Sequence, residues 1–256
     1  MPVPGRPYIL AETNWKSVKA TDYEVAILPW GATEAHNFHL PYGTDNYESA
    51  WVAAEAARKA WDAGEKVIVL PTLPFGVNTG QLDIRLCINM NPSTQAAVLA
   101  DVVESLEEQG IMKLVILNSH GGNDFRQIIR ELQSMSSVFI STVNWWSCVD
   151  SKPYFDEPGD HAGELETSVM LEIAPDLVLP LTDAGEGKAR KFHLEGLRNG
   201  TAWAPRHWMS VTDDTGVGNP ASATRDRGVQ FLEAVTTKIA SYLIELSQAD
   251  LEKLYE

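Results

Sequence analysis

Four residues that commonly bind metal ions follow two predicted strands of this 256-residue chain; they are Glu34, His36, Asp45 and His120. Carboxylate oxygen and neutral imidazole nitrogen are the usual ligands of Zn²⁺ and of neighbouring first-row divalent ions. An ion held in this way makes hydroxide from water near neutral pH, which is the chemistry that unreactive amides require. Because Glu34 and His36 are two positions apart, an extended chain points both side chains to one side. The pattern predicts a metal-dependent hydrolase.

A second polar cluster contains His161, Glu164 and Glu166, and opens a predicted helix that runs to Ala174. An imidazole beside a carboxylate could supply a proton shuttle and a further metal ligand. The position of Glu164 is also explained without any function, because acidic side chains complement the dipole at a helix start. Residues two apart on a helix are separated by roughly 200°, so Glu164 and Glu166 cannot both face one pocket.

Several of these residues have structural alternatives. Asp45 precedes the predicted helix 46–62 and has Glu48 three positions later, which resembles a capping box, so Asp45 could cap that helix as well as bind metal. For His39 we expect a structural role within its loop. Trp145 and Trp146 could fill the core or form the wall of an aromatic pocket.

The remaining pattern predicts the elements that position these side chains. Apolar, β-branched runs at 24–30, 66–72, 113–119 and 138–144 are typical of buried parallel strands, and helical patterns lie at 46–62, 93–109, 124–134 and 227–246. Their alternation predicts a single α/β domain over residues 1–256, with a mostly parallel sheet covered by helices on both faces. In such sheets ligands bind at the carboxyl ends of the strands, where the polar clusters fall. The stretch 180–220 is less regular and predicts binding loops or oligomer contacts.

The composition argues against several other functions. Twenty Lys and Arg against 35 Asp and Glu give a net charge of −15, which repels nucleic acids and anionic membranes. The first twenty residues lack the basic start and apolar core of a signal peptide, so we expect a cytoplasmic protein. Cys87 and Cys148 stand alone and do not predict a thiolate zinc site.

The same residues form motifs that resemble those of the creatininase (creatinine amidohydrolase) family, spread from about residue 25 to residue 228. The motifs are Leu28-Pro-Trp-Gly31 with Glu34-Ala-His36 and His39-Leu-Pro41; Gly43-Thr-Asp45; Asn118-Ser-His120-Gly-Gly-Asn123; His161-Ala-Gly-Glu-Leu-Glu166-Thr-Ser168; and Thr215-Gly-Val-Gly-Asn-Pro220 with Ala223-Thr224 and Gly228.

The resemblance implies an α/β amidohydrolase that uses one or two divalent ions, Zn²⁺ first with Mn²⁺ or Fe²⁺ as alternatives, and that assembles as a homo-oligomer, commonly a hexamer. It implies that Glu34, His36, Asp45 and His120 are ligands, with Asp45 bridging two ions. It also implies that Glu166 is an active-site acid and that His161 carries protons.

Three departures from the family pattern indicate a changed substrate. Asn37-Phe38 replaces Gly-Pro, and Leu86-Cys-Ile-Asn-Met90 stands where a Phe-Pro-Gly-Thr segment is usual. Gly122 replaces a glutamate ligand of creatininases, so one ion must lose a ligand or recruit Glu166 or Glu164. The predicted function is hydrolysis of a linear or cyclic amide C–N bond in a small non-peptide molecule. The alternatives are a formamide deformylase, a peptide-trimming hydrolase, and a non-catalytic metal- or ligand-binding protein.

Overall fold

The computed structural model describes residues 5–255, and a four-stranded parallel sheet lies at its centre, in the order β2-β1-β3-β4. The strands are β1 (Val25–Trp30), β2 (Val67–Val69), β3 (Lys113–Asn118) and β4 (Phe139–Asn144). Trp30 pairs with Asn118 and Asn118 with Asn144, so three strands end side by side. Because all strands run the same way, the segments that follow them meet at one edge of the sheet.

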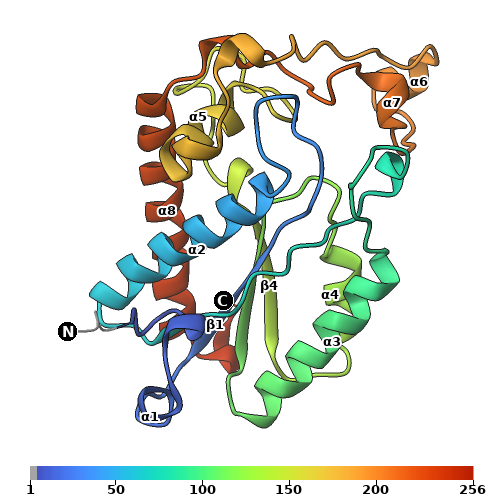
Figure 1. Ribbon diagram of the computed structural model, residues 1–256. Coiled ribbons are helices and arrows are strands. Elements are labelled where there is room, and N and C mark those ends of the chain that lie inside the picture. Colours follow the sequence, from blue (N-terminus) through green and yellow to red (C-terminus); the bar gives the residue numbers. More distant parts are fainter. Residues whose placement is uncertain (1–4, 256) are drawn as a thin grey trace.

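Helices cover both faces of the sheet, which confirms the predicted α/β class (Figure 1). On one face lie α2 (Thr44–Asp62) and α8 (Arg225–Gln248), with α5 (Glu164–Ile173) packed against α8; on the other lie α3 (Pro92–Glu108) and α4 (Arg126–Leu132). Three helices of a single turn complete the set: α1 (Trp15–Val18), α6 (Glu195–Arg198) and α7 (Trp208–Val211). No helix within residues 5–255 has the length and apolar character needed to cross a bilayer.

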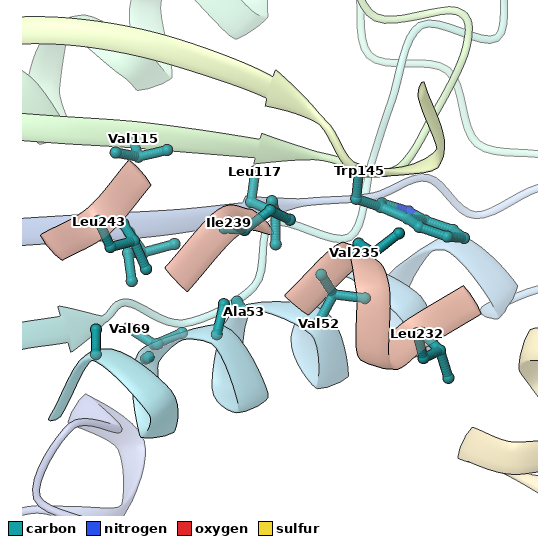
Figure 2. Close-up of a cluster of buried hydrophobic side chains, with 14 of the residues drawn as sticks. Val52, Ala53, Val69, Val115, Leu117, Trp145, Leu232, Val235, Ile239 and Leu243 are labelled. Carbon is teal, nitrogen blue, oxygen red and sulfur yellow. The ribbon is translucent and has the colours of Figure 1, made fainter. Parts of the chain in front are cut away.

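The core has two main layers because β1 and β3 are buried on both sides. In β1, Val25 and Ile27 join the cluster beneath α2 and α8, whereas Ala26, Leu28 and Trp30 join the cluster beneath α3 and α4. Figure 2 shows the first layer, in which side chains of α2 and α8 meet Val115, Leu117 and Trp145. Burial on both faces explains why these strands read as continuous apolar runs and not as alternating ones.

The predicted elements are present, and their boundaries differ in ways that the local sequence explains. The pairing of β2 covers only Val67–Val69 of the run predicted at 66–72. The helix α3 begins one residue before the predicted range 93–109, because Asn91 is its N-cap and Pro92 occupies the first helical position. Gly110 follows the end of α3 with φ of +76°, as expected for a glycine that terminates a helix.

Gly228 allows α8 to approach α5, which carries Glu166. A Cβ atom at residue 228 would lie 2.0 Å from the backbone oxygen of Ser168. Alanine gains at most about 1 kcal/mol in helix propensity, whereas overpacking typically costs about 1–3 kcal/mol. Because backbone atoms cannot rotate away, Gly228→Ala is expected to lower the free energy of unfolding, measured by denaturant titration.

The matched control is Gly196→Ala in α6, where the nearest atom to an added Cβ lies 4.0 Å away. This variant should unfold at an unchanged or slightly higher denaturant concentration. If Gly228→Ala were as stable as Gly196→Ala, the close approach of α5 and α8 would not be a tight constraint.

Candidate metal centre

The predicted ligands come together at the carboxyl edge of the sheet. Glu34 and His36 follow β1, Asp45 is the second residue of α2, and His120 follows β3. Asp45 Oδ1 lies 3.1 Å from His36 Nε2, and Asp45 Oδ2 lies 3.2 Å from His120 Nδ1. Glu34 Oε1 lies 2.9 Å from the same His120 Nδ1. All four side chains are buried, with at most 6% of each residue exposed.

The capping alternative for Asp45 is not realised. Gly43 is the N-cap of α2, and no side chain caps this helix. Asp45 instead turns its two carboxylate oxygens toward two different imidazoles. His39 belongs to none of the possible ligand sets in the part of the chain that the structure describes, and its Nε2 atom lies 2.8 Å from Thr167 Oγ1, in the structural role expected for it.

Three histidines of the centre, His36, His120 and His161, share one arrangement. One ring nitrogen is hydrogen-bonded to a backbone carbonyl, and the other faces carboxylates. His36 Nδ1 lies 3.2 Å from the Glu34 carbonyl, His120 Nε2 lies 3.1 Å from the Val77 carbonyl, and His161 Nε2 lies 2.8 Å from the Ala35 carbonyl. A carbonyl only accepts, so these nitrogens carry the protons. In the neutral form of each imidazole the opposite nitrogen therefore carries the lone pair and faces the carboxylates, which is how protein histidines are oriented toward a metal ion.

The ligand atoms form sets that fit two ions. Glu34, Asp45 and His120 offer three atoms within 4.8 Å of one another, and so do His36, Asp45 and Glu166; a third set contains Glu34, His36 and His161. Asp45 Oδ2 is buried and has no hydrogen-bond partner among the described residues. A buried carboxylate oxygen without a donor is costly unless a cation completes its surroundings. The donor set therefore fits divalent ions.

Glu166 and Glu164 face opposite ways on α5. Glu166 joins His36 and Asp45, and one of its oxygens accepts a hydrogen bond from the Ala162 amide, whose residue adopts a positive φ of 51°. Glu164 instead pairs with Arg227 of α8 and accepts from the Glu157 amide. This corrects the prediction of Glu164 as a catalytic residue, because the helix turns its side chain away from the centre.

Burial and charge oppose each other at the centre. Burial favours the neutral form of Glu34, but the imidazoles of His120 and His161 outweigh it and lower the pKa of Glu34. Burial favours the neutral form of His36, yet the charge and hydrogen bond of Asp45 raise the pKa of His36 to about 9. The pKa of His120 is also raised, by Glu34 and Asp45 against the effect of burial. The carboxylates thus attract positive charge, which a proton or a metal ion supplies.

Metal binding should therefore compete with protons. In protein stripped of metal, stabilisation by protonated His36 is complete below its ordinary pKa of 6.5 and is lost as the pH rises through about 9. An ion requires the neutral imidazole, so zinc affinity is expected to rise across this window by up to about tenfold per pH unit for each proton displaced. Chelator competition at fixed pH values measures this dependence, and a constant affinity from pH 6.5 to 9 would contradict it.

Three further contributors were not predicted from the sequence as site residues. Glu48, one turn after Asp45, is fully buried; its Oε2 atom accepts from the Ser119 hydroxyl, and burial together with Glu166 and Asp45 raises its pKa. Gln81 donates a hydrogen bond to Glu34, and the Val77 carbonyl orients His120. Asn123 orients neighbours and does not cap a helix: its side chain bonds Asn118 and the Val77 amide. The spacing of Glu48 from Asp45 was the one available signal.

The structure leaves no room at position 122 for the glutamate that the resemblance to the family implies there. A Cβ atom at residue 122 would lie 2.3 Å from the Val77 carbonyl oxygen and 2.4 Å from His120 Nε2. Gly122→Glu is therefore expected to displace His120 and to weaken zinc binding in chelator competition. Gly121→Glu is the control, because no atom lies within 4 Å of a Cβ at that position. Tighter zinc binding by Gly122→Glu would contradict this steric account.

A cavity of about 330 Å³ opens beside the centre. Its lining includes residues of the centre, namely Glu34, Asp45, His120, His161 and Glu166. Its walls include Trp146 and Trp208, and its lining extends to Trp203 and Arg206 in the irregular stretch before α7. Of the two tryptophans, Trp145 fills the core and Trp146 lines the cavity, so each of the two predicted roles is taken by one of them.

A buried carboxylate and imidazole centre at the carboxyl edge of a parallel α/β sheet defines a metallohydrolase class of site. The model of the creatininase family, described as creatinine amidohydrolase, matches residues 11–243. The chain therefore belongs to the creatininase family of metal-dependent amidohydrolases.

Individual relatives differ in their stated activities. The chain is 23% identical over 199 residues to a creatinine amidohydrolase of Pseudomonas putida, across 68% of this chain and 75% of that protein. It is 28% identical over 156 residues to the mycofactocin precursor peptide peptidase of Mycolicibacterium smegmatis, across 60% of each chain.

Solved structures show the same architecture. A crystal structure of a Bacteroides fragilis protein assigned as a creatinine amidohydrolase has a TM-score of 0.91 and 43% identity, over 98% of this chain and 99% of that one. A creatininase structure has a TM-score of 0.76 and 23% identity, over 95% of this chain and 99% of that one, and so shares the fold.

Proposed function

We propose that this protein hydrolyses the C–N bond of a linear or cyclic amide, using divalent ions held by Glu34, His36, Asp45, His120 and Glu166. One observation carries the proposal: three histidines are each fixed to a backbone carbonyl through one nitrogen and turn the other toward buried carboxylates. Because the other nitrogen of each neutral imidazole then points its lone pair into a site rich in negative charge, the arrangement suits metal chemistry better than nucleophilic catalysis.

Different residues of the site would bind the ions and transfer the proton during hydrolysis. A divalent ion bound by these ligands polarises a carbonyl group and makes water nucleophilic near neutral pH. Hydrolysis joins the water oxygen to the carbonyl carbon and breaks the C–N bond, and the departing nitrogen must gain a proton. His161 Nδ1 faces the centre, 3.7 Å from Glu34 Oε1, and can accept a proton from the attacking water and pass it to the departing nitrogen. Its Nε2 atom remains hydrogen-bonded to the Ala35 carbonyl.

Zn²⁺ is the ion that we propose first, with Mn²⁺ and Fe²⁺ as alternatives. Mixed nitrogen and oxygen ligands suit all three ions, and thiolate is not needed. Among proteins of this fold, one creatininase structure is a manganese form and another is of the Zn-Zn type. The two overlapping ligand sets that share Asp45 support two ions in each chain.

A peptide substrate is the second candidate. Relatives named as peptidases of the mycofactocin precursor match this chain, one of them over 227 residues at 26% identity. The cavity also extends from the buried centre to the exposed side chain of Trp203, so a chain end could enter and continue outward.

The test combines metal removal with a panel of substrates. Protein treated with a chelator and then restored with Zn²⁺ or Mn²⁺ is assayed on creatinine, formamides and short peptides. We expect hydrolysis of one class, lost with the chelator and regained with the ion. Metal binding without hydrolysis of any class would favour the non-catalytic alternative, and hydrolysis that persists without metal would contradict the proposal.

A further inference from the structure

Gln81 is a buried residue beside the metal centre, and its amide side chain carries no charge. It ends the short 3₁₀ helix Thr79–Gln81 in the segment between β2 and α3, and only 2% of it is exposed. The segment is tied down by the Asn78 amide, which donates to Asn89, and by the Ile88 amide, which donates to the Thr33 carbonyl. Gln81 is thus held in place by backbone and side-chain bonds on both sides.

Both ends of the Gln81 amide are engaged in a defined direction. Its Nε2 group donates to Glu34 Oε2, and its Oε1 atom accepts from the Cys87 thiol at 3.4 Å. The Cys87 sulfur in turn accepts the Ala35 amide at 3.3 Å. The thiol therefore links the amide of Gln81 to the backbone next to Glu34, and a flipped amide would lose both side-chain bonds.

This arrangement leaves one oxygen of Glu34 for the cation. Oε2 is occupied by the Gln81 amide, whereas Oε1 faces His120 Nδ1 at 2.9 Å and His161 Nδ1 at 3.7 Å. An amide donor fixes the rotamer of the carboxylate without neutralising its charge, unlike lysine or arginine. The donor also remains when an ion binds, because it occupies the other oxygen.

We propose that Gln81, oriented by Cys87, is a positioning residue that sets Glu34 for metal binding. The inference rests on the proposed function at this site. Cys87 lies between β2 and α3, so this orienting contact comes from the same irregular segment that carries Gln81. Partners of this kind typically change metal affinity by about 10- to 100-fold when removed.

Zinc affinity measured by chelator competition tests the role of Gln81. Gln81→Met keeps the length of the side chain and removes the donor, and is expected to weaken zinc binding by about 10- to 100-fold. Cys87→Ala should weaken it less, because the amide remains but is free to turn. The control is Gln133→Met, which removes a side chain that bonds the Val138 carbonyl and the Ile140 amide away from the centre. That variant should lose stability but retain zinc affinity.

The pH dependence of zinc affinity in Gln81→Glu separates hydrogen bonding from packing, because a packing role would give no such dependence. The new acid can donate to Glu34 only when it is protonated, so its zinc affinity relative to the unmodified protein should recover as the pH falls from 8 toward about 5.5. If Gln81→Met bound zinc as tightly as the unmodified protein, the inference would be overturned. A change in KM alone would also overturn it, because Gln81 would then be a substrate contact. If the unmodified protein bound no zinc, the proposed function would fail first.

Discussion

Replacing His161 by alanine should lower kcat by about 10²- to 10⁴-fold, the usual contribution of a positioned proton carrier, while both ions stay bound. His161 Nε2 is occupied by the Ala35 carbonyl, so only Nδ1 faces the centre and the departing nitrogen. The ligand sets Glu34–Asp45–His120 and His36–Asp45–Glu166 are complete without it. Steady-state kinetics and elemental analysis on one preparation measure both effects.

His161 also belongs to a third possible ligand set with Glu34 and His36, so metal content decides its role. Loss of an ion from His161→Ala would make it a ligand, and full activity would remove it from the reaction. His161→Gln can keep a hydrogen bond to the Ala35 carbonyl but cannot carry a proton, and should be as slow as the alanine variant. His207→Ala, on an exposed side chain, is the control and should keep both activity and metal.

Asp45→Asn is expected to have the largest effect on metal binding, because Asp45 is shared by both complete ligand sets. The amide retains the shape of the side chain but removes the charge and one acceptor. Loss of an outer partner alone typically costs about 10- to 100-fold in metal affinity, so loss of a shared ligand should exceed roughly 100-fold for both ions. Hydrolysis should fall with metal occupancy, and elemental analysis after dialysis measures the change.

Asp62→Asn is the matched control, since Asp62 lies at the exposed end of the same helix and pairs with Arg58. It should retain the metal content of the unmodified protein. If Asp45→Asn lost only one ion, the carboxylate would belong to a single site. Retention of both ions would mean that Asp45 is not a ligand.

The fold could be predicted because the strands are buried on both faces. This burial requires unbroken apolar sequences, such as Val25–Trp30, and the helices between them carry one apolar side each. Glu34, His36, Asp45 and His120 could be placed together because parallel strands end at one edge. Only the alternative roles, such as Asp45 as a helix cap, required the structure to decide.

The rest of the site depends on contacts that sequence spacing does not encode. Sequence spacing predicted that Glu166 and Glu164 face apart, but which of them faces the centre follows from tertiary contacts: α5 packs Leu165 and Val169 into the core, and Glu164 pairs with Arg227 of α8. Gln81 and Val77 lie in an irregular segment whose path is fixed by tertiary hydrogen bonds, so no periodic pattern indicates where they point. The sequence indicated only that Gly122 supplies no ligand. The structure adds the reason that a larger side chain does not fit there: the Val77 carbonyl lies where its Cβ atom would be.

We propose that divalent ions bind at Asp45, between Glu34, His36, His120 and Glu166. Anomalous diffraction from crystals grown with Zn²⁺, recorded above and below the zinc absorption edge, locates the bound ions. We expect two peaks, one contacted by Glu34, Asp45 and His120 and the other by His36, Asp45 and Glu166. Zinc peaks located elsewhere, or none in fully loaded protein, would contradict it.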